Sequence, residues 1–147
     1  IFKGQKKVVK NLVQNPETKA PVEGKKILLI DDDKLILMTL KRLLAKEGYK
    51  VTTALNGMAA LKHIQEAEFD LIISDIKMPN MDGVETVKKI REYLVKNNKK
   101  PIPEIFITAY AKEEIYQMAL SLKAAEYIEK PFDVKALLQA IKKVIQE

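Results

Sequence analysis

Short apolar runs alternate with amphipathic stretches through most of this chain. Runs of four to six residues predict strands at 26–30, 49–54, 70–74, 104–108 and 126–129. Each run precedes a stretch whose apolar residues recur three and four positions apart, and these stretches predict helices near 34–47, 57–67, 84–96, 112–122 and 133–146. The alternation therefore predicts five strand–helix units.

The residues at 27–30 form a continuous run of Leu and Ile, which is typical of a strand in a parallel sheet that helices cover on both faces. The predicted fold class is α/β, with a doubly wound five-stranded parallel sheet. In the strand order 2-1-3-4-5, the direction of winding reverses between the first and third strands. Ligands of open α/β sheets bind beside the carboxyl ends of the strands at such a reversal.

The first 24 residues follow a different pattern. Apolar residues of 5–14 lie on one side of a possible helix that Pro16 would end. Residues 15–24 contain two prolines and a glycine among polar residues, which is typical of a linker. We therefore expect a basic linker or extension at 1–24 and the folded domain at 25–147.

The net charge of +6 is concentrated near the start of the chain. Residues 1–26 carry seven Lys and two acidic residues, whereas 27–147 carry nineteen basic and eighteen acidic residues. The folded part is therefore nearly neutral, and it has no basic stripe, so we expect no nucleic-acid binding through this domain. A solvated linker explains the basic segment better than an arm for nucleic acid or an acidic partner.

The composition is that of an ordinary globular protein. The 147 residues suit one domain, with 47% apolar and 31% charged residues. No apolar run approaches the roughly 18 residues of a membrane span, and the chain shows no signal-peptide pattern and no cysteine. We expect a cytoplasmic protein without membrane association. Because the chain begins with Ile1, we also expect it to be a piece of something longer.

Polar side chains stand at the carboxyl ends of four of the five predicted strands. These residues are Asp31, Asp32, Asp33, Asp75, Thr108 and Lys130. The carboxyl ends of parallel strands meet at one edge of the sheet, where ligands bind. Taken singly, Asp33 fits a helix N-cap, and the other residues fit turn, strand-end or surface positions. Taken together, they predict one site.

Neighbouring carboxylates repel one another unless a cation lies among them. Two or three carboxylates with a carbonyl and waters are usual ligands of Mg²⁺, so Asp31 and Asp32 predict a metal site. A carboxylate such as that of Asp75 can accept a phosphoryl group and form an acyl phosphate. The hydroxyl of Thr108 and the ammonium of Lys130 would then balance the phosphoryl charge together with the metal.

Four separated blocks contain these residues: ILLIDDDK at 27–34, IISDIKMPNMDG at 72–83, IFITAY at 105–110 and YIEKPF at 127–132. In this order and at these separations, they resemble the receiver domain of bacterial two-component response regulators, the family of the chemotaxis regulators. The resemblance extends from Lys25 to about Gln146. It implies a flavodoxin-like (βα)5 fold with strand order 2-1-3-4-5, in agreement with the predicted sheet.

The resemblance also implies roles for the acidic residues. Asp32 resembles a direct Mg²⁺ ligand, and Asp31 resembles an acid that acts mainly through water. Asp75 resembles the phosphoacceptor, which is a metal ligand as well, and the backbone carbonyl of Lys77 would be the third protein oxygen. The implied cofactor is Mg²⁺, with Mn²⁺ as a substitute.

Further residues resemble the parts of a switch. Thr108 resembles the hydroxyl that moves to meet the phosphoryl group, and Lys130 resembles the cation that pairs with it. The bond from Lys130 to Pro131 resembles one that is usually cis in this family. Tyr127 stands at the aromatic switch position, although an ordinary half-buried strand tyrosine fits the same pattern. The phosphoryl group would shift a two-state equilibrium at the face formed by the fourth helix, fifth strand and fifth helix.

The implied phosphoryl donor is a histidine kinase or a histidine phosphotransfer protein. The implied reader of the switched face is a downstream effector or a fused output domain. The domain would be a regulatory phosphoacceptor rather than an enzyme, promoting only its own phosphorylation and dephosphorylation. The lone histidine, His63, is predicted in the middle of a helix away from the strand ends, which fits a surface residue better than a phosphorelay group.

Some positions depart from the family pattern or vary within it. Lys123 stands where the family often has Gly, so either a left-handed turn there is strained or the loop takes another shape. Lys77 and Tyr110 occupy variable positions that flank the phosphorylation site and tune dephosphorylation in the family. A bulky pair there would screen attacking water, so we hypothesise a phosphoryl lifetime of minutes or longer.

Three alternatives share features of this pattern. A phosphohydrolase of the haloacid dehalogenase type uses a DxD motif, and Asp31 and Asp33 have that spacing, but Leu35 stands where that family usually has Thr or Val. A flavodoxin-like FMN protein needs a Ser/Thr/Gly-rich phosphate loop, whereas three aspartates would repel the phosphate. A pseudoreceiver would act without phosphorylation, yet every residue of the phosphorylation site is present here.

Overall fold

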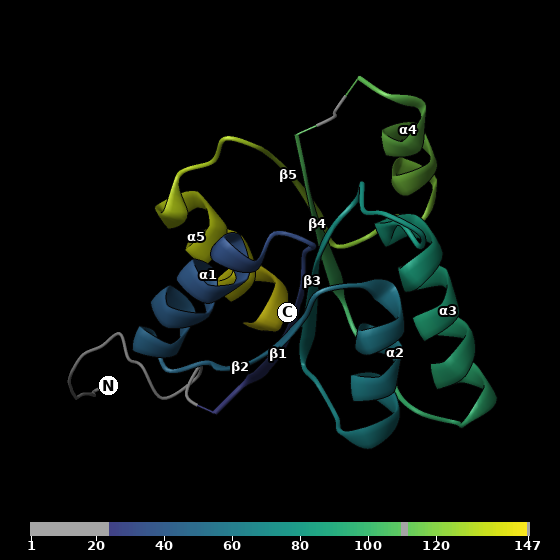
Figure 1. The fold of residues 1–147 in the computed structure, drawn as a ribbon. Coiled ribbons are helices and arrows are strands. Elements are labelled where there is room, and N and C mark those ends of the chain that lie inside the picture. Colours follow the sequence, from purple (N-terminus) through teal and green to yellow (C-terminus); the bar gives the residue numbers. More distant parts are fainter. Residues whose placement is uncertain (1–23, 110–111, 147) are drawn as a thin grey trace, which may run out of the picture.

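The computed structural model describes residues 24–109 and 112–146, which form a five-stranded parallel sheet with helices on both faces (Figure 1). The strands are β1 (Lys26–Ile30), β2 (Lys50–Ala54), β3 (Leu71–Asp75), β4 (Glu104–Thr108) and β5 (Glu126–Glu129). The helices are α1 (Lys34–Lys46), α2 (Gly57–Glu66), α3 (Gly83–Lys96), α4 (Glu114–Ser121) and α5 (Val134–Gln146). The strand order is β2-β1-β3-β4-β5, as predicted.

The predicted elements are confirmed to within two residues at each end. Helix α4 differs most, because it begins at Glu114 rather than at 112. The helix predicted at 5–14 lies outside the described residues, as does the linker apart from Gly24. The domain boundary at 24/25 therefore stays a prediction.

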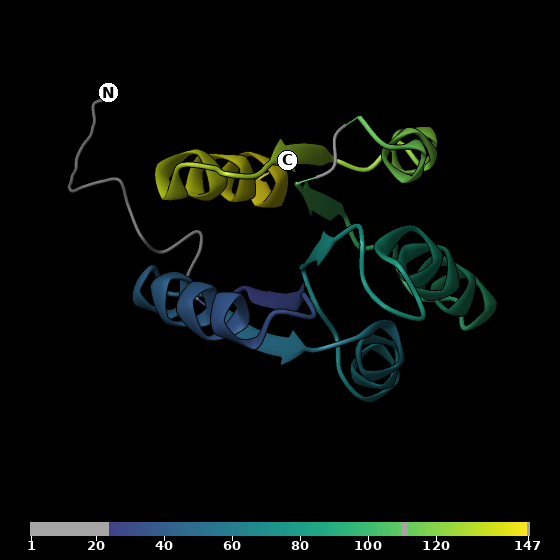
Figure 2. The same cartoon turned by 45° about the horizontal axis from the view of Figure 1, so that its top comes forward.

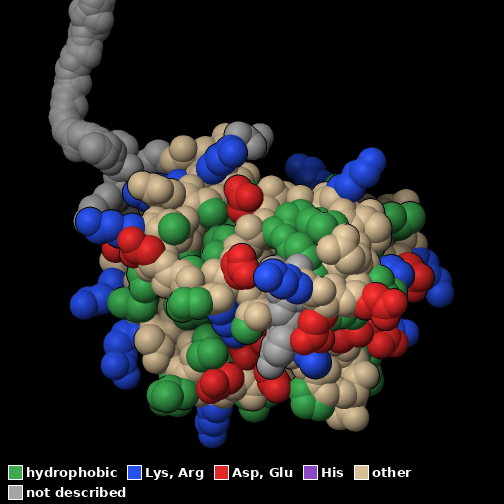
Figure 3. Space-filling model, turned by 90° about the horizontal axis from the view of Figure 1, so that it is seen from above, with side chains coloured by type: hydrophobic (Ala, Val, Ile, Leu, Met, Phe, Trp, Pro, Cys, Tyr) green, Lys and Arg blue, Asp and Glu red, His purple; other side chains and the backbone are tan. Residues whose placement is uncertain are grey.

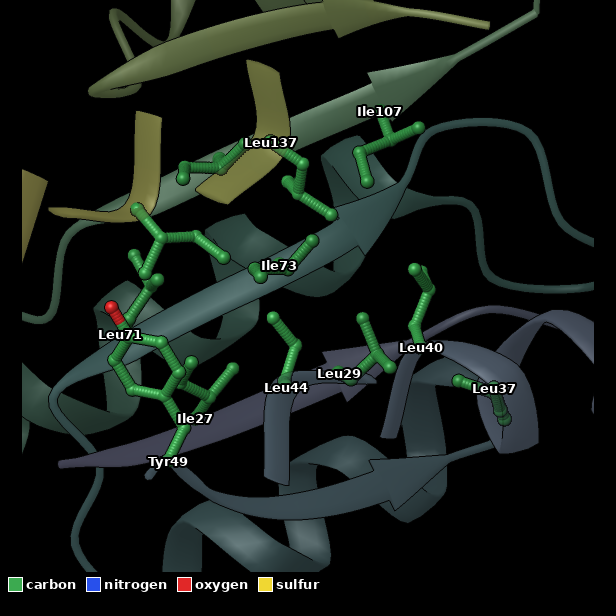
Figure 4. Packing of buried hydrophobic residues seen from close by; sticks show 12 residues of the cluster. Ile27, Leu29, Leu37, Leu40, Leu44, Tyr49, Leu71, Ile73, Ile107 and Leu137 are labelled. Carbon is green, nitrogen blue, oxygen red and sulfur yellow. The ribbon is translucent and has the colours of Figure 1, made fainter. Parts of the chain in front are cut away.

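Helices α1 and α5 lie on one face of the sheet, and α2, α3 and α4 lie on the other (Figure 2). Successive side chains of a strand point to opposite faces. Ile27 and Leu29 accordingly belong to the core beneath α1 and α5, which Figure 4 shows, whereas Leu28 and Ile30 belong to the core beneath α2 and α3. Burial on both faces explains why this strand is apolar at every position.

The three central strands are the most buried part of the sheet. All of β3 and β4 is buried, and so is β1 after its first residue, while the edge strands β2 and β5 are half buried. Close packing on both sides holds these central strands in place. Asp31 directly follows β1, and Asp75 and Thr108 are the last residues of β3 and β4, so the fold gives the candidate site a rigid base.

Asp33 caps α1, as its sequence position predicts. Its Oδ1 accepts hydrogen bonds from the backbone N–H groups of Leu35 at 2.9 Å and Ile36 at 3.3 Å. These bonds satisfy donors that the first turn of a helix leaves unpaired. The cap accounts for Asp33 and separates its role from that of Asp31 and Asp32.

Candidate functional site

The register between β1 and β3 sets Asp31 beside Asp75. Ile30 pairs with Ser74, so the next residue of each strand falls at the same level of the carboxyl edge. Both aspartates are nearly buried, at 5% and 8% exposure. Asp31 Oδ1 accepts from the N–H two residues later at 2.9 Å, and Asp75 Oδ1 accepts from the N–H of Ile76 at 2.9 Å. Backbone donors thus orient both carboxylates.

Lys130 reaches both carboxylates from the end of β5. Its Nζ lies 3.4 Å from Asp31 Oδ2 and 3.5 Å from Asp75 Oδ2. The backbone N–H of Lys130 donates to the carbonyl of Thr108 at 2.7 Å, which anchors it to the end of β4. The bond to Pro131 is cis, as the family resemblance implies. One ammonium therefore contacts two aspartates at the carboxyl ends of two different strands.

Burial is the largest single influence on the pKa values of Asp31, Asp75 and Lys130. Burial raises the pKa of Asp75 to about 6, repulsion from Asp31 adds to the rise, and attraction to Lys130 opposes it. The pKa of Asp31 is raised as well, mainly by burial. Burial favours a lower pKa for Lys130, but the carboxylates of Asp75 and Asp31 outweigh it, and the pKa is raised. Burial and repulsion from neighbouring carboxylates therefore make the ionised forms of Asp31 and Asp75 unfavourable. A further positive charge close to them would stabilise the ionised forms.

Asp31, Asp32 and Asp75 form an acidic group with the donor chemistry of a metal site. One carboxylate oxygen from each lies within 4.8 Å of the others. Asp32 is exposed, so the group is open to solvent on one side. Viewed from above, acidic and basic side chains lie next to each other near the middle of this face (Figure 3). Carboxylate oxygens suit a hard divalent cation such as Mg²⁺, whose charge would offset their repulsion.

Thr108 lies at the same edge as the acidic group. It ends β4 one residue after Ile107, which pairs with Asp75. Thr108 is almost completely buried, at 1% exposure. The structure thus brings together the strand-end residues that the sequence singles out from β1, β3, β4 and β5.

Tyr127 packs against α4 rather than against the acidic group. Its ring stacks on Phe106 at a centroid distance of 5.9 Å and meets the ring of Tyr116 edge-on at 6.2 Å. Its hydroxyl donates to the carbonyl of Ala119 at 2.8 Å and accepts from the N–H of Ala124 at 2.8 Å. The half-buried tyrosine is therefore tied to the end of α4 and to the loop that follows it.

Lys77 connects two loops beside the acidic group. Its Nζ lies 3.1 Å from Glu113 Oε1, and both side chains are exposed. The contact with Glu113 could not be predicted from the sequence, because no local pattern links residues so far apart in the chain. The role of the Lys77 carbonyl as a metal ligand stays a prediction. Tyr110, its predicted neighbour at the site, lies outside the described residues.

Three more positions singled out in the sequence lie outside the acidic group. Lys123 has a φ of 55°, so of its two alternatives the left-handed turn is the one adopted. His63 is half exposed in α2 and is not a member of the acidic group. Gly83, the last residue of the block IISDIKMPNMDG, begins α3 and lies against β3, where a Cβ would collide with the carbonyl oxygen of Asp75.

The fold and the site together define a class of protein, namely a doubly wound α/β domain with aspartates, a threonine and a lysine at the carboxyl edge. The family model of the response regulator receiver domain matches residues 27–142. That match covers nearly the whole sheet and every residue of the acidic group. The chain belongs to this family, and it is a signalling domain of two-component systems.

Individual relatives agree with this assignment. The chain is 35% identical over 122 residues to sporulation initiation phosphotransferase F of Bacillus subtilis, covering 83% of this chain and 94% of that protein. It is 39% identical over 111 residues to the transcriptional regulatory protein ZraR of Klebsiella oxytoca, covering 76% of this chain but only 24% of that protein. The chain therefore spans nearly the whole of one relative and about a quarter of the other.

Among solved structures, the fold is similar to that of the response regulator protein TrrA of Thermotoga maritima in complex with Mg²⁺ and BeF. The TM-score is 0.66 at 34% identity, and the similarity covers 82% of this chain and 98% of that one. Within the described part of the present chain, no helix has the length and apolar character to cross a membrane.

Proposed function

We propose that this domain is a phosphoryl-accepting switch in which Asp75 takes the phosphoryl group. The observation that carries the proposal is the meeting of three carboxylates and one lysine at a single point of the sheet edge. Asp75 lies at the end of the central strand β3, nearly buried and with its carboxylate oriented by the N–H of Ile76. The receiver family, to which the chain belongs, supports this role.

The carboxylate of Asp75 would act as the nucleophile. Its oxygen attacks the phosphorus of a phosphohistidine, a P–O bond forms, and the P–N bond breaks with its electron pair returning to the imidazole. The acyl phosphate that results brings more negative charge to the edge. Lys130, whose Nζ already lies 3.5 Å from Asp75 Oδ2, would pair with the phosphoryl oxygens, and Thr108 would donate its hydroxyl.

Asp31, Asp32 and Asp75 would hold Mg²⁺, with the backbone carbonyl of Lys77 as a further oxygen ligand and Mn²⁺ as a substitute metal. When bound, the cation balances the charge of the carboxylates and of the phosphoryl group. Asp31 is held by a backbone N–H and by Lys130, which suits a ligand that acts through water. The Mg²⁺ complex of the Thermotoga maritima relative supports a divalent metal here.

The signal would leave the site through Tyr127. Its hydroxyl joins β5 to Ala119 at the end of α4 and to Ala124 in the following loop. A shift of Thr108 toward the phosphoryl group would change the space beside Tyr127 and favour another arrangement of the α4, β5 and α5 face. A downstream effector or fused output domain would read that face, and a histidine kinase or phosphotransfer protein would supply the phosphoryl group.

Incubation with acetyl phosphate and Mg²⁺, followed by intact-protein mass spectrometry, tests this function. We expect one phosphoryl group per chain, dependent on the metal and removed by hydroxylamine, as an acyl phosphate is. The adduct should persist for minutes or longer, because the predicted pair of Lys77 and Tyr110 would screen it from attacking water, and decay within seconds would contradict that lifetime. Continuous release of phosphate from a phosphate ester, without a stable adduct, would instead identify a hydrolase.

A further inference from the structure

A groove lies at the amino edge of the sheet, away from the acidic group. It runs between the last turns of α3 and the loop that joins α4 to β5, and its volume is about 540 Å³. The end of α3 that forms one wall is at the bottom of Figure 1, while the carboxyl ends of the strands point upward. None of the residues assigned to phosphoryl transfer lines this groove.

The groove has an apolar floor and an apolar rim. Leu94 of α3 is buried beneath it, and Ile102 of the following loop is half buried. Val95 is 76% exposed, although it is next to Leu94 on the same helix. An exposed valine that continues a buried apolar floor loses its contact with water when an apolar side chain enters the groove, which favours binding.

The lining of the groove carries a net positive charge, because its one acidic residue is paired with an arginine of the same lining. Arg91 forms two hydrogen bonds with Glu104, at 2.8 Å and 2.7 Å, so these two residues compensate each other. Lys99 and Lys123 stand on opposite sides of the groove, and neither forms an ion pair with another residue in the described ranges. The net charge of the lining therefore attracts carboxylates.

The loop wall of the groove is preformed. Lys123 holds a left-handed turn, and the next N–H, of Ala124, donates to the hydroxyl of Tyr127 at 2.8 Å. The N–H of Ala125 donates to the carbonyl of Glu104 at 2.9 Å, which fastens the loop to the first residue of β4. A wall that is already ordered reduces the entropic cost of binding a partner.

We propose that this groove binds a short acidic and apolar segment of a partner protein. An apolar side chain of that segment packs on Leu94, Val95 and Ile102, and flanking carboxylates pair with Lys99 and Lys123. The first 26 residues of this chain fit poorly, because they carry seven lysines and two acidic residues. A two-fold contact with a second copy would set one lysine rim against another.

Fluorescence anisotropy of a fluorescein-labelled peptide of alternating leucine and glutamate tests the proposal. We expect saturable binding to the unmodified chain, weakened by added salt. Lys99→Glu reverses one rim charge and Val95→Ser removes the exposed apolar contact, and each should weaken binding roughly tenfold. Lys142→Glu makes the same charge change on the exposed surface of α5 and should leave binding unchanged.

Circular dichroism and phosphoryl uptake from acetyl phosphate check that each variant is folded. If neither the unmodified chain nor any variant takes up a phosphoryl group, that result counts against the proposed function of Asp75 and not against the groove. Any one of three results would overturn the proposal. These are no saturable binding to the unmodified chain, binding of the peptide to Lys99→Glu as tight as to Lys142→Glu, and binding of a peptide of alternating leucine and lysine as tight as that of the leucine and glutamate peptide. Sedimentation that shows a dimer lost in Val95→Ser would assign the groove to a second copy instead.

Discussion

Replacement of Asp75 by asparagine should make the metal-free protein more stable. The folded chain holds this carboxylate nearly buried and near Asp31, so its ionised form is less favourable there than in the unfolded chain. Asparagine keeps the size of the carboxyl group and removes its charge. The substitution therefore removes the unfavourable burial and repulsion, although it also gives up the ion pair with Lys130.

The raised pKa of Asp75 sets the size of this effect, and it already includes the attraction of Lys130. The pKa rises from 3.8 to about 6 on folding. Each pKa unit corresponds to about 1.4 kcal/mol, so ionised Asp75 lowers the free energy of unfolding by up to about 3 kcal/mol. Solvent and salt at the open side of the site screen part of this energy. We expect Asp75→Asn to gain about 1–3 kcal/mol at neutral pH.

The same pKa fixes the pH dependence of the gain. Below the unfolded pKa of 3.8, Asp75 is protonated in both the folded and unfolded chains. Its charge then contributes nothing to the difference in free energy of unfolding between the unmodified protein and Asp75→Asn. As the pH rises toward about 6, the unfolded chain gives up its proton first, and the unmodified protein loses stability relative to Asp75→Asn. Above that range the difference stays constant.

Urea denaturation in EDTA, followed by circular dichroism at several pH values across this window, measures the gain. As proposed above, Mg²⁺ would bind the folded chain at the acidic group. It should then stabilise the unmodified protein more than the variant, because the variant lacks one of the three carboxylates. The difference in free energy of unfolding should therefore shrink when Mg²⁺ replaces EDTA. If the unmodified protein in EDTA were as stable as Asp75→Asn at neutral pH, the electrostatic reasoning would be refuted.

Three further substitutions test the surroundings of the site by urea denaturation. Gly83→Ala should cost about 2–4 kcal/mol, because a Cβ there collides with the carbonyl oxygen of Asp75. Arg91→Ala should cost about 3 kcal/mol, since it leaves the buried carboxylate of Glu104 without its two hydrogen bonds, and adding Glu104→Gln should recover part of the loss. Asp33→Ala should cost about 1 kcal/mol through loss of the α1 N-cap, whereas Asp33→Ser should be nearly neutral.

A different result would contradict each of these three predictions. Unchanged stability in Gly83→Ala would mean that α3 can move away from β3 at little cost. A loss in Arg91→Ala that Glu104→Gln does not reduce would show that packing of the arginine matters more than the charge it pairs with. Equal effects of Ala and Ser at position 33 would exclude the side-chain cap as the cause.

The strands and helices could be predicted because each carries a local pattern. The continuous apolar residues of β1 and the helical spacing of α5 depend only on neighbours in the chain, and both are confirmed. The strand-end aspartates could also be brought together from the sequence, because parallel strands place their carboxyl ends at one edge. The strand topology alone places them there, without knowledge of side-chain positions.

Contacts between distant elements could not be predicted in this way. The ion pair of Lys77 with Glu113 depends on where two loops end, and the pairing of Arg91 with Glu104 depends on the packing of α3 beside β4. The sequence does not decide the conformation of Lys123, because a lysine at a positive φ is unfavourable in itself. The structure shows that hydrogen bonds around the turn, including that between Ala124 and Tyr127, hold it in place.

The sharpest test of Asp75 as the phosphoacceptor is phosphoryl uptake by Asp75→Asn, measured beside Asp82→Asn. Asp82 directly precedes Gly83, which lies against Asp75, and its side chain caps α3 by accepting from the N–H of Glu85, a role that asparagine also fills. After incubation with acetyl phosphate and Mg²⁺, we expect one phosphoryl group per chain on the unmodified protein and on Asp82→Asn, and none on Asp75→Asn. Equal labelling of Asp75→Asn would contradict the assignment of Asp75 as the phosphoacceptor.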